Sequence, residues 1–179
     1  MEAGREETVW REITGQEGKL CLELPDNLKK MTEEMAWRRF PYSQRPQEMF
    51  SDPDGDRIFT YSILEKQLRE GQVYSAAAGI QKLISHAYPE SIREQARTVR
   101  LRFGMAGWFS FFTGGMKEDS CHYMFVLPAD ERMVFGGYHF PAKEETTERK
   151  VFLRILKSIW LIGKDMENGE ADDGRGRIQ

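Results

Sequence analysis

The sequence predicts an α+β domain, with a mostly antiparallel sheet sandwiched between helices (an α/β/α sandwich). Residues 105–113, 120–127 and 132–140 are apolar at both odd and even positions. Successive side chains of a strand point to opposite faces, so strands of this kind are covered on both sides. Short turns join these segments, and residues 72–88 and 146–163 have the apolar periodicity of helices that cover such a sheet.

The first part of the chain is predicted to form two strands and a short helix. Leucines occupy every second position of residues 19–24, which is the period of a half-buried strand, and residues 8–13 precede them across a turn. Thr32 is expected to cap a helix at residues 33–39, whose early glutamates and late arginines suit the helix dipole.

A hairpin and a longer helix are expected next. Residues 48–51 and 57–64 flank Asp52 to Asp56, a stretch rich in turn-forming residues. The helix predicted at 72–88 has apolar residues at helical spacing and ends before Pro89.

The remaining elements are one amphipathic strand and the final helix. Residues 97–103 alternate between apolar and polar side chains, which predicts a strand with one wet face. The helix at 146–163 is expected to direct Ile159 and Ile162 inward.

Length and charge limit the possible classes of protein. A chain of 179 residues suits one domain with its own core and is short for two. We expect this domain to span residues 8–163, with a flexible N-terminus at 1–7 and a disordered tail at 164–179. The net charge of −3 provides little attraction for nucleic acid, so no nucleic-acid partner is expected.

The two cysteines, Cys21 and Cys121, are too few for a disulfide framework, and neither belongs to a CxxC pair. One bridge between them is an alternative, but buried free thiols are expected. The first seven residues lack the apolar core of a signal peptide, and no window approaches the roughly 18 apolar residues of a membrane span. We therefore expect a cytoplasmic location and no membrane insertion.

Glycine pairs do not predict a phosphate site in this chain. There is no GxxxxGK[ST] loop, and neither the pair 114–115 nor the pair 136–137 precedes a predicted helix. The first pair suits a hairpin turn. The second lies inside a predicted strand, where missing side chains indicate close approach of a helix, a bulge or a ligand.

No catalytic arrangement emerges from the sequence. Ser110 lies among aromatic residues without the glycine elbow of a nucleophilic serine, and the side chains of Cys121 and His122 diverge on a strand. Asp52 to Asp56 resembles half of a calcium loop but lacks its closing glutamate, so a turn is expected. We therefore expect no enzyme activity and no cofactor.

Two histidines form a candidate ligand site. If Asp130 and Glu131 are the tip of a two-residue hairpin, His122 lies opposite His139, close enough for both imidazoles to bind one metal ion. Cys121 points to the opposite face, so any further ligand has to come from elsewhere. The simpler interpretation is a polar pair that is hydrogen-bonded at the end of the sheet.

A second candidate surface combines aromatic rings with guanidinium groups, a combination that is enriched at protein interfaces. Its residues lie in the short helix and the loop after it: Trp37, Arg38, Arg39, Tyr42 and Arg45. In the alternative interpretation, Trp37 and Phe40 pack the loop against the core and the arginines are solvated. The sheet face near Trp108 is a further candidate for partner binding.

The order of the predicted elements resembles that of the Mog1/PsbP-like superfamily. Four short stretches add to the likeness: Leu22 to Pro25, Phe40 to Pro46, Phe59 to Ser62 and Tyr88 to Ser91. The three closing strands and the C-terminal helix extend it over residues 8–163.

This resemblance implies an antiparallel sheet between helices and, usually, no enzyme activity. It implies a binding role, because relatives bind Ran, support photosystem II, or act as periplasmic lipoproteins or as chaperones of secretion-system effectors. This chain departs from several of them, because it has no lipoprotein or transit signal. We therefore predict a non-catalytic protein-binding or chaperone-like module. The alternative is a small-molecule or metal-binding protein that uses His122 and His139.

Overall fold

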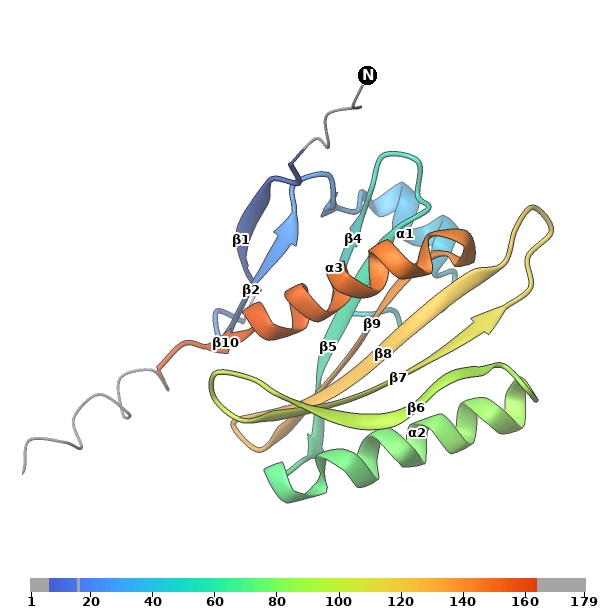
Figure 1. The fold of residues 1–179 in the computed structure, drawn as a ribbon. Helices are drawn as coiled ribbons and strands as arrows, with labels where there is room; N and C mark the ends of the chain where they lie inside the picture. Colours follow the sequence, from blue (N-terminus) through green and yellow to red (C-terminus); the bar gives the residue numbers. More distant parts are fainter. Residues whose placement is uncertain (1–6, 16, 164–179) are drawn as a thin grey trace, which may run out of the picture.

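The chain combines ten strands with three α-helices in the part that the structure describes (Figure 1). The computed structural model describes residues 7–15 and 17–163. The helices are α1 (Glu33–Arg39), α2 (Val73–Ala87) and α3 (Glu145–Ser158), and the 3₁₀ turns η1 (Glu70–Gln72) and η2 (Ala142–Glu144) precede the last two. The strands are β1 (Trp10–Thr14), β2 (Leu20–Pro25), β3 (Lys29–Lys30), β4 (Glu48–Ser51), β5 (Ile58–Gln67), β6 (Ile92–Arg100), β7 (Met105–Thr113), β8 (Ser120–Ala129), β9 (Arg132–Pro141) and β10 (Trp160–Leu161).

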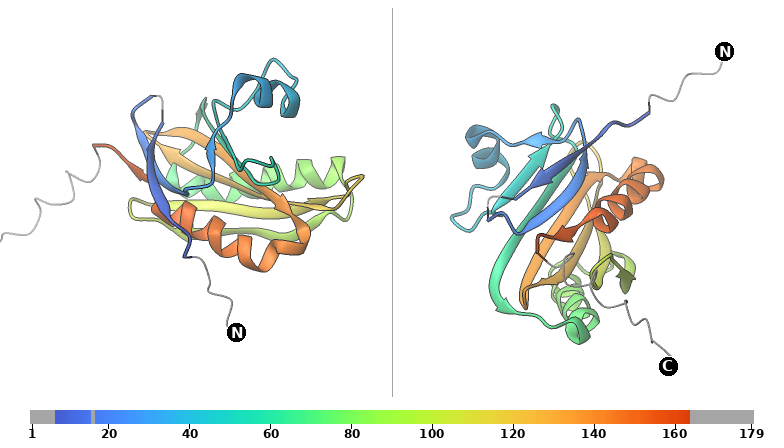
Figure 2. Two further views of the ribbon diagram at one scale, coloured as in Figure 1. Left: turned by 90° about the horizontal axis from the view of Figure 1, so that it is seen from above. Right: turned by 90° about the vertical axis from the view of Figure 1, so that its left-hand side faces the viewer.

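The strands form two antiparallel sheets that lie in different layers. The large sheet has the order β3-β4-β5-β9-β8-β7-β6, and the small sheet has the order β1-β2-β10. Figure 2 shows α2 and α3 on opposite sides of the large sheet, with the small sheet on the side of α3. The predicted sandwich is therefore confirmed, and the small sheet shares one outer layer with α3.

A glycine allows α2 to approach the large sheet closely. A Cβ atom on Gly107 of β7 would lie 2.8 Å from the carbonyl oxygen of Val73 and 2.9 Å from the Cβ of Ala77. Both distances are shorter than a Cβ atom tolerates, so this contact requires glycine in β7 and a small residue in α2.

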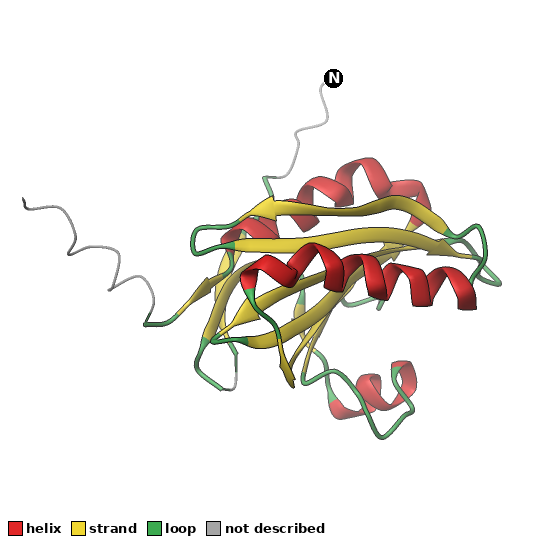
Figure 3. Cartoon of the chain, turned by 90° about the horizontal axis from the view of Figure 1, so that it is seen from below, coloured by secondary structure: helices red, strands yellow, loops and turns green. Residues whose placement is uncertain are grey.

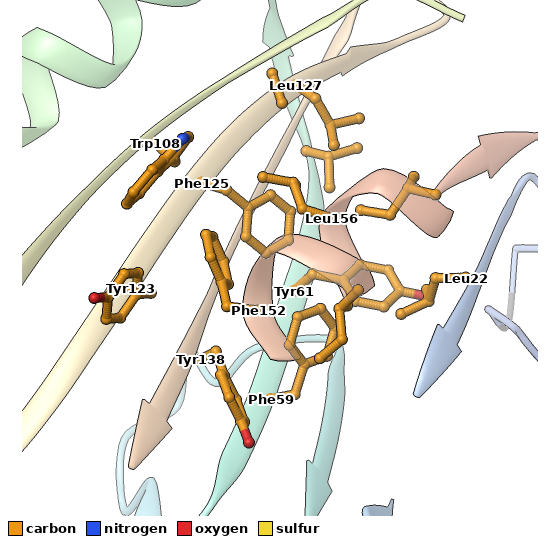
Figure 4. Packing of buried hydrophobic residues seen from close by; sticks show 14 of the residues in the cluster. Leu22, Phe59, Tyr61, Trp108, Tyr123, Phe125, Leu127, Tyr138, Phe152 and Leu156 are labelled. Carbon is orange, nitrogen blue, oxygen red and sulfur yellow. The ribbon is translucent and has the colours of Figure 1, made fainter. Parts of the chain in front are cut away.

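Aromatic rings fill the layer between the large sheet and α3 (Figure 4). The ring of Phe152 in α3 is fully buried, with its centroid 5.2 Å from that of Tyr123 and 5.7 Å from that of Trp108. On the sheet, Phe59 stacks on Phe125 with the centroids 5.9 Å apart. Large buried aromatic surfaces of this kind contribute most of the hydrophobic stabilisation of a core.

The predicted final helix is too long. α3 ends at Ser158, and the backbone of Ile159 is already extended. The following residues form β10, in which Trp160 pairs with Cys21 and Leu161 with Leu20. The open edge of β2 thus gains a partner strand, and Ile162 is exposed rather than directed inward as predicted.

The strand predicted at residues 97–103 begins earlier and ends sooner, as β6. Leu101 turns back, because its N–H donates to the carbonyl oxygen of Gly104 at 2.7 Å. β6 is an edge strand of the large sheet. Its first half is rich in polar and charged residues, so the sequence pattern did not indicate where the strand begins. The other long strands and α1 lie close to their predicted positions, and Thr32 caps α1 by accepting from the N–H of Met35 at 3.2 Å.

Cys21 and Cys121 are buried free thiols, as predicted. The flexible N-terminus predicted at 1–7 lies outside the described residues apart from Glu7, and so does all of the disordered tail predicted at 164–179.

Truncating the central ring of the core is expected to destabilise the fold strongly. Phe152→Ala should lower the free energy of unfolding by about 3–5 kcal/mol, because it removes a buried ring and leaves a cavity. Leu83→Ala, at an exposed position of α2, is the control and should change it by no more than about 0.5 kcal/mol. Urea unfolding measures both. Equal effects of the two variants would contradict the packing described.

Candidate binding site

The part of the large sheet that α2 leaves uncovered is hollowed. On this side α2 packs over β6, β7 and β8, whereas β5 and β9 lie beside α1 and the loop after it (Figure 3). Thr60 and Ser62 of β5, with Phe135 of β9, line a hollow of about 570 Å³. Residues 44–47 of the loop form its side.

A second hollow, of about 690 Å³, lies at the other end of the same strands. Four segments line it: the C-terminal end of α1, the turn between β4 and β5, the loop between β7 and β8, and the ends of β8 and β9. His122 and His139 lie in its wall, and so do Arg39 and Phe40. Both volumes are in the range of ligand pockets, and both hollows are open to solvent.

Gln47 anchors the loop after α1 to β5. Its side-chain amide donates to the carbonyl oxygen of Ile63 at 3.0 Å and accepts from the N–H of Ile63 at 2.9 Å. Its own N–H donates to the hydroxyl of Ser62 at 3.0 Å. The side chain therefore replaces a missing strand neighbour and fixes the loop beside the first hollow.

The predicted interface residues of α1 and the loop lie at the surface. Trp37 is 55% exposed and Tyr42 is 70% exposed. The guanidinium of Arg45 lies 4.3 Å from the centre of the Trp37 ring, and it also forms an ion pair with Glu33 at 3.7 Å. Trp37 and Arg45 thus form one stacked unit, which agrees with the interface interpretation and not with a ring packed against the core.

The two other arginines of this group have different surroundings. Arg38 forms an exposed ion pair with Glu34 at 2.5 Å, one helical turn away, which contributes little to stability. Arg39 donates from Nη2 to the carbonyl oxygen of Gly55, so it ties α1 to the turn between β4 and β5. Arg38 is available to a partner, whereas Arg39 already holds the wall of the second hollow.

Trp108 does not lie at a surface, contrary to the prediction. It is 2% exposed and packs against Tyr123 and Phe152, on the face of the sheet that α3 covers. The guanidinium groups of Arg97 and Arg149 lie over its ring, with distances of 5.1 and 5.5 Å to the centroid. We therefore leave Trp108 out of the candidate site.

The hairpin between β8 and β9 pairs the two histidines as predicted. Asp130 and Glu131 both have positive φ, 49° and 61°, as a two-residue type I′ turn requires. His122 is consequently opposite His139, and their Nδ1 atoms are 2.6 Å apart. The Nε2 atom of His122 is 2.8 Å from the hydroxyl oxygen of Thr113, and the His122 ring stacks on Phe111 at 4.6 Å.

Both histidines are neutral at pH 7. Burial lowers the pKa of His122 to about 4. Burial, and then the charge that a protonated His122 would add, lower the pKa of His139 to about 3. Within the short contact, one Nδ1–H therefore donates a hydrogen bond to the unprotonated Nδ1 of the other ring.

The two mid-strand glycines make room for neighbouring side chains, not for a helix or a bulge. A Cβ on Gly136 would lie 2.4 Å from the carbonyl oxygen of Thr60 and 2.6 Å from the ring of Phe125. A Cβ on Gly137 would lie 2.8 Å from the sulfur of Met124 and 3.3 Å from Cε1 of His139. The side chain of Met124 thus fills the place beside the His139 ring that a side chain at position 137 would take.

The segment Asp52 to Asp56 is a turn, as predicted, and not a calcium loop. Oδ1 of Asp52 accepts from the N–H groups of Asp56 at 2.8 Å and Arg57 at 3.1 Å, so this carboxylate organises the turn itself. Among residues 7–15 and 17–163, no group of three or more His, Cys, Asp or Glu side chains could hold a metal ion.

A charged network that the sequence did not indicate fixes the base of this hairpin to α3. Arg57 pairs with Asp52 at 3.1 Å, with Glu148 at 2.9 Å and also with Glu144. Burial alone would lower the pKa of Arg57, but its hydrogen bonds to Glu148 and Asp52 raise it overall. The hydroxyl of Tyr138 donates to Glu148 at 2.6 Å. The sequence contains one indication of this network, because Glu148 occupies an inward position of the predicted helix, where a carboxylate needs a partner.

Comparison with solved structures places this fold among known proteins. No protein-family model matches the chain. No curated protein matches it in sequence either. The Ran-binding protein Mog1p of Saccharomyces cerevisiae is similar in structure, with a TM-score of 0.56 and 8% identity over 89% of this chain and 99% of that one.

Two further structures share the architecture. Cyanobacterial PsbP (CyanoP) of Synechocystis has a TM-score of 0.52 and 12% identity, over 88% of this chain and 95% of its own. LpqN of Mycobacterium tuberculosis, involved in cell envelope biogenesis, has a TM-score of 0.54 and 12% identity, over 87% and 91%. These likenesses confirm the predicted Mog1/PsbP-like fold. At such identities they establish the fold alone.

The helices of the described residues offer no candidate for a membrane span, since none is both long enough and apolar enough.

The histidine pair is expected to make stability depend on pH. In the unfolded chain both imidazoles take up protons near pH 6.5, whereas in the fold their pKa values are about 4 and 3. The stabilisation is therefore complete above pH 6.5 and is lost as the pH falls toward 4. Each histidine contributes a slope of at most about 1.4 kcal/mol per pH unit.

Urea unfolding between pH 4.5 and 8 measures this slope. The variant H122N/H139N should show a shallower loss of stability on acidification than the unmodified chain. His86→Asn, at an exposed position of α2, is the matched control and should keep the original slope. The same slope in all three proteins would contradict the neutral, buried pair.

Proposed function

We propose that this protein is a non-catalytic protein-binding module, which binds its partner with the surface formed by α1, the following loop and the first hollow. The observation that carries the proposal is the exposed ring of Trp37, which stacks on the half-buried guanidinium of Arg45 next to a hollow that α2 leaves uncovered. Exposed Tyr42 extends the same surface. Aromatic and arginine side chains beside a recess are the residue types that dominate binding energy at interfaces.

The chemistry of this surface indicates what the partner presents. The hollow has Leu64 and Phe135 beside the hydroxyl groups of Thr60 and Ser62, so it suits an apolar side chain with a polar edge. Arg38 adds an exposed positive charge whose present ion pair is easily exchanged. We therefore expect the partner to insert an apolar side chain and to place a carboxylate near α1.

Further support for a binding role comes from the fold. Mog1p, which shares the architecture, is named for binding another protein, Ran. A chaperone-like role is one form of such binding, because the surface would then shield an apolar segment of the partner. The buried free thiols of Cys21 and Cys121 are typical of a reducing compartment, which supports the cytoplasmic location that we propose with this role.

The geometry of the possible nucleophiles supports a role without catalysis. Burial raises the pKa of Cys121 to about 11, so its thiol is protonated at neutral pH. Ser110 is buried and pairs with Tyr123 across the sheet, whereas His122 pairs with the next residue, Phe111. Neighbouring positions point to opposite faces, so Ser110 and His122 do not form a dyad.

The alternative is binding of a small molecule or metal ion in the second hollow. The observation that favours it is the histidine pair in the wall of a recess of about 690 Å³. If the protein binds a small molecule or metal ion in this hollow, substitutions in the surface around Trp37 should not change the affinity for that ligand.

Site-specific crosslinking in the native host tests the binding surface. Benzoylphenylalanine in place of Tyr42 should give a discrete photo-crosslinked adduct with one partner protein, because the side chain lies at the proposed interface. The same replacement at Tyr74, which is 56% exposed on α2, is the matched control and should not give this adduct. No adduct at position 42, or the same adduct at both positions, would contradict the proposal.

Affinity for the captured protein measures the contribution of the stacked pair. W37A/R45A should weaken binding by about 2 kcal/mol or more, because aromatic and arginine anchors dominate interfaces. Tyr74→Ala should leave the affinity unchanged. The free energy of unfolding should change by no more than about 0.5 kcal/mol in Tyr74→Ala, whose side chain is exposed. Because the side chain of Arg45 is only 21% exposed, the fold of W37A/R45A is checked by urea unfolding before its affinity is compared. Unchanged affinity of W37A/R45A would contradict this surface.

A further inference from the structure

The histidine pair places two ring nitrogens side by side in the wall of an open hollow. The two Nδ1 atoms face each other at 2.6 Å, in the wall of an open hollow of about 690 Å³. We propose that His122 and His139 bind one monovalent copper ion, Cu(I), through these two Nδ1 atoms. This proposal is independent of the protein-binding surface at α1.

The ring of His122 is oriented by contacts other than the one with His139. Its Nε2 atom is 2.8 Å from the hydroxyl oxygen of Thr113, and its face stacks on Phe111 with the ring planes 16° apart. A histidine that ligates a metal typically donates its second ring N–H to such an outer partner, which fixes the tautomer and the ring plane. His122 therefore presents Nδ1 toward His139 before any ion arrives.

The protons of the pair also suit metal binding. The contact between the two Nδ1 atoms holds one proton, which one ring carries while the other ring accepts the hydrogen bond. When the ion enters, the single proton between the rings leaves one Nδ1 and the same ring takes up a proton at Nε2. Both rings then carry Nε2–H, and no net proton is released.

The pair needs a modest adjustment to take up an ion. Metal–imidazole bonds are about 2 Å long, so two nitrogens on opposite sides of one ion lie about 4 Å apart. The proposal therefore requires the two rings to rotate apart, with the strand register unchanged. The open hollow in front of the rings leaves room for this movement.

The number of ligands selects the kind of ion. Zinc requires four ligands, and the described residues contain no group of three or more His, Cys, Asp or Glu side chains that could hold a metal ion. Cu(I) has a filled d shell and is stable with two ligands in a linear arrangement. The cost of burying an ion rises with the square of its charge, which also favours a monovalent ion in this partly buried position.

A neighbouring thioether sulfur, which is a soft ligand, also favours copper. Met124 lies two residues from His122 on the same strand face, and its sulfur fills the place that a side chain on Gly137 would take, next to the His139 ring. Imidazole nitrogen and thioether sulfur are ligand types that suit Cu(I), whereas hard ions prefer carboxylate oxygen.

Anaerobic titration of the full chain with Cu(I), in competition with bicinchoninate, tests this site. We expect one Cu(I) ion per chain, with two nitrogen ligands at about 2 Å in X-ray absorption spectra. A shell made of sulfur alone would place the ion on cysteine or methionine side chains and would overturn the proposal. A parallel titration with Zn(II) should show much weaker binding, and equally tight one-to-one binding of Zn(II) would also overturn it.

Variants and a direct spectroscopic readout complete the test. H122N/H139N should bind Cu(I) at least ~100-fold more weakly, whereas H86N should bind it as the unmodified chain does. In the unmodified chain, Ag(I) as a spectroscopic substitute should shift the ¹⁵N signals of Nδ1 in His122 and His139 but not in His86. That readout does not depend on how well the double variant folds. Unshifted Nδ1 signals, or full Cu(I) binding by a folded double variant, would overturn the proposal.

Discussion

The register between β8 and β9 determines which side chains form the core and which form the candidate sites. The two-residue turn at Asp130 and Glu131 sets this register, with both residues in the left-handed region. It directs Tyr123 and Phe125 toward α3, where they join the aromatic core, and directs His122 to the opposite face. A slip of one residue would exchange the two faces, exposing the aromatic rings and burying the histidines in the core.

The helices cover the two faces of the large sheet to different extents, and this difference explains where the two hollows lie. One face of the large sheet is covered by α3 together with the small sheet. The other face has α2 over β6, β7 and β8 only, and α1 is too short to cover β5 and β9. The loop after α1, anchored by Gln47, borders the remaining open part. Both hollows are therefore a consequence of the architecture and not of a local irregularity.

Local patterns predicted much of the fold. The doubly apolar segments at 105–113, 120–127 and 132–140 gave the central strands, and the capping residue Thr32 marked the start of α1. The predictions failed where tertiary contacts override local preference. Apolar residues after Ser158 fit a helix equally well, and the open edge of β2 made them a strand.

The candidate sites were predictable to different degrees. The opposition of His122 and His139 followed from counting residues away from a turn, because strand pairing is periodic. Exposure of Trp37 and burial of Trp108 did not follow, since each depends on which helix covers which face. The network around Arg57 joins residues that are far apart in the chain, so spacing carried little sign of it.

Hydrogen–deuterium exchange of the chain bound to its captured partner shows whether the uncovered sheet face beside α1 is the binding surface. Slower exchange is expected in residues 33–47 and in β5 and β9 when the partner is bound, with exchange in α2 unchanged. Slower exchange confined to α2 or to the edge strand β6, with residues 33–47 unaffected, would contradict this binding surface.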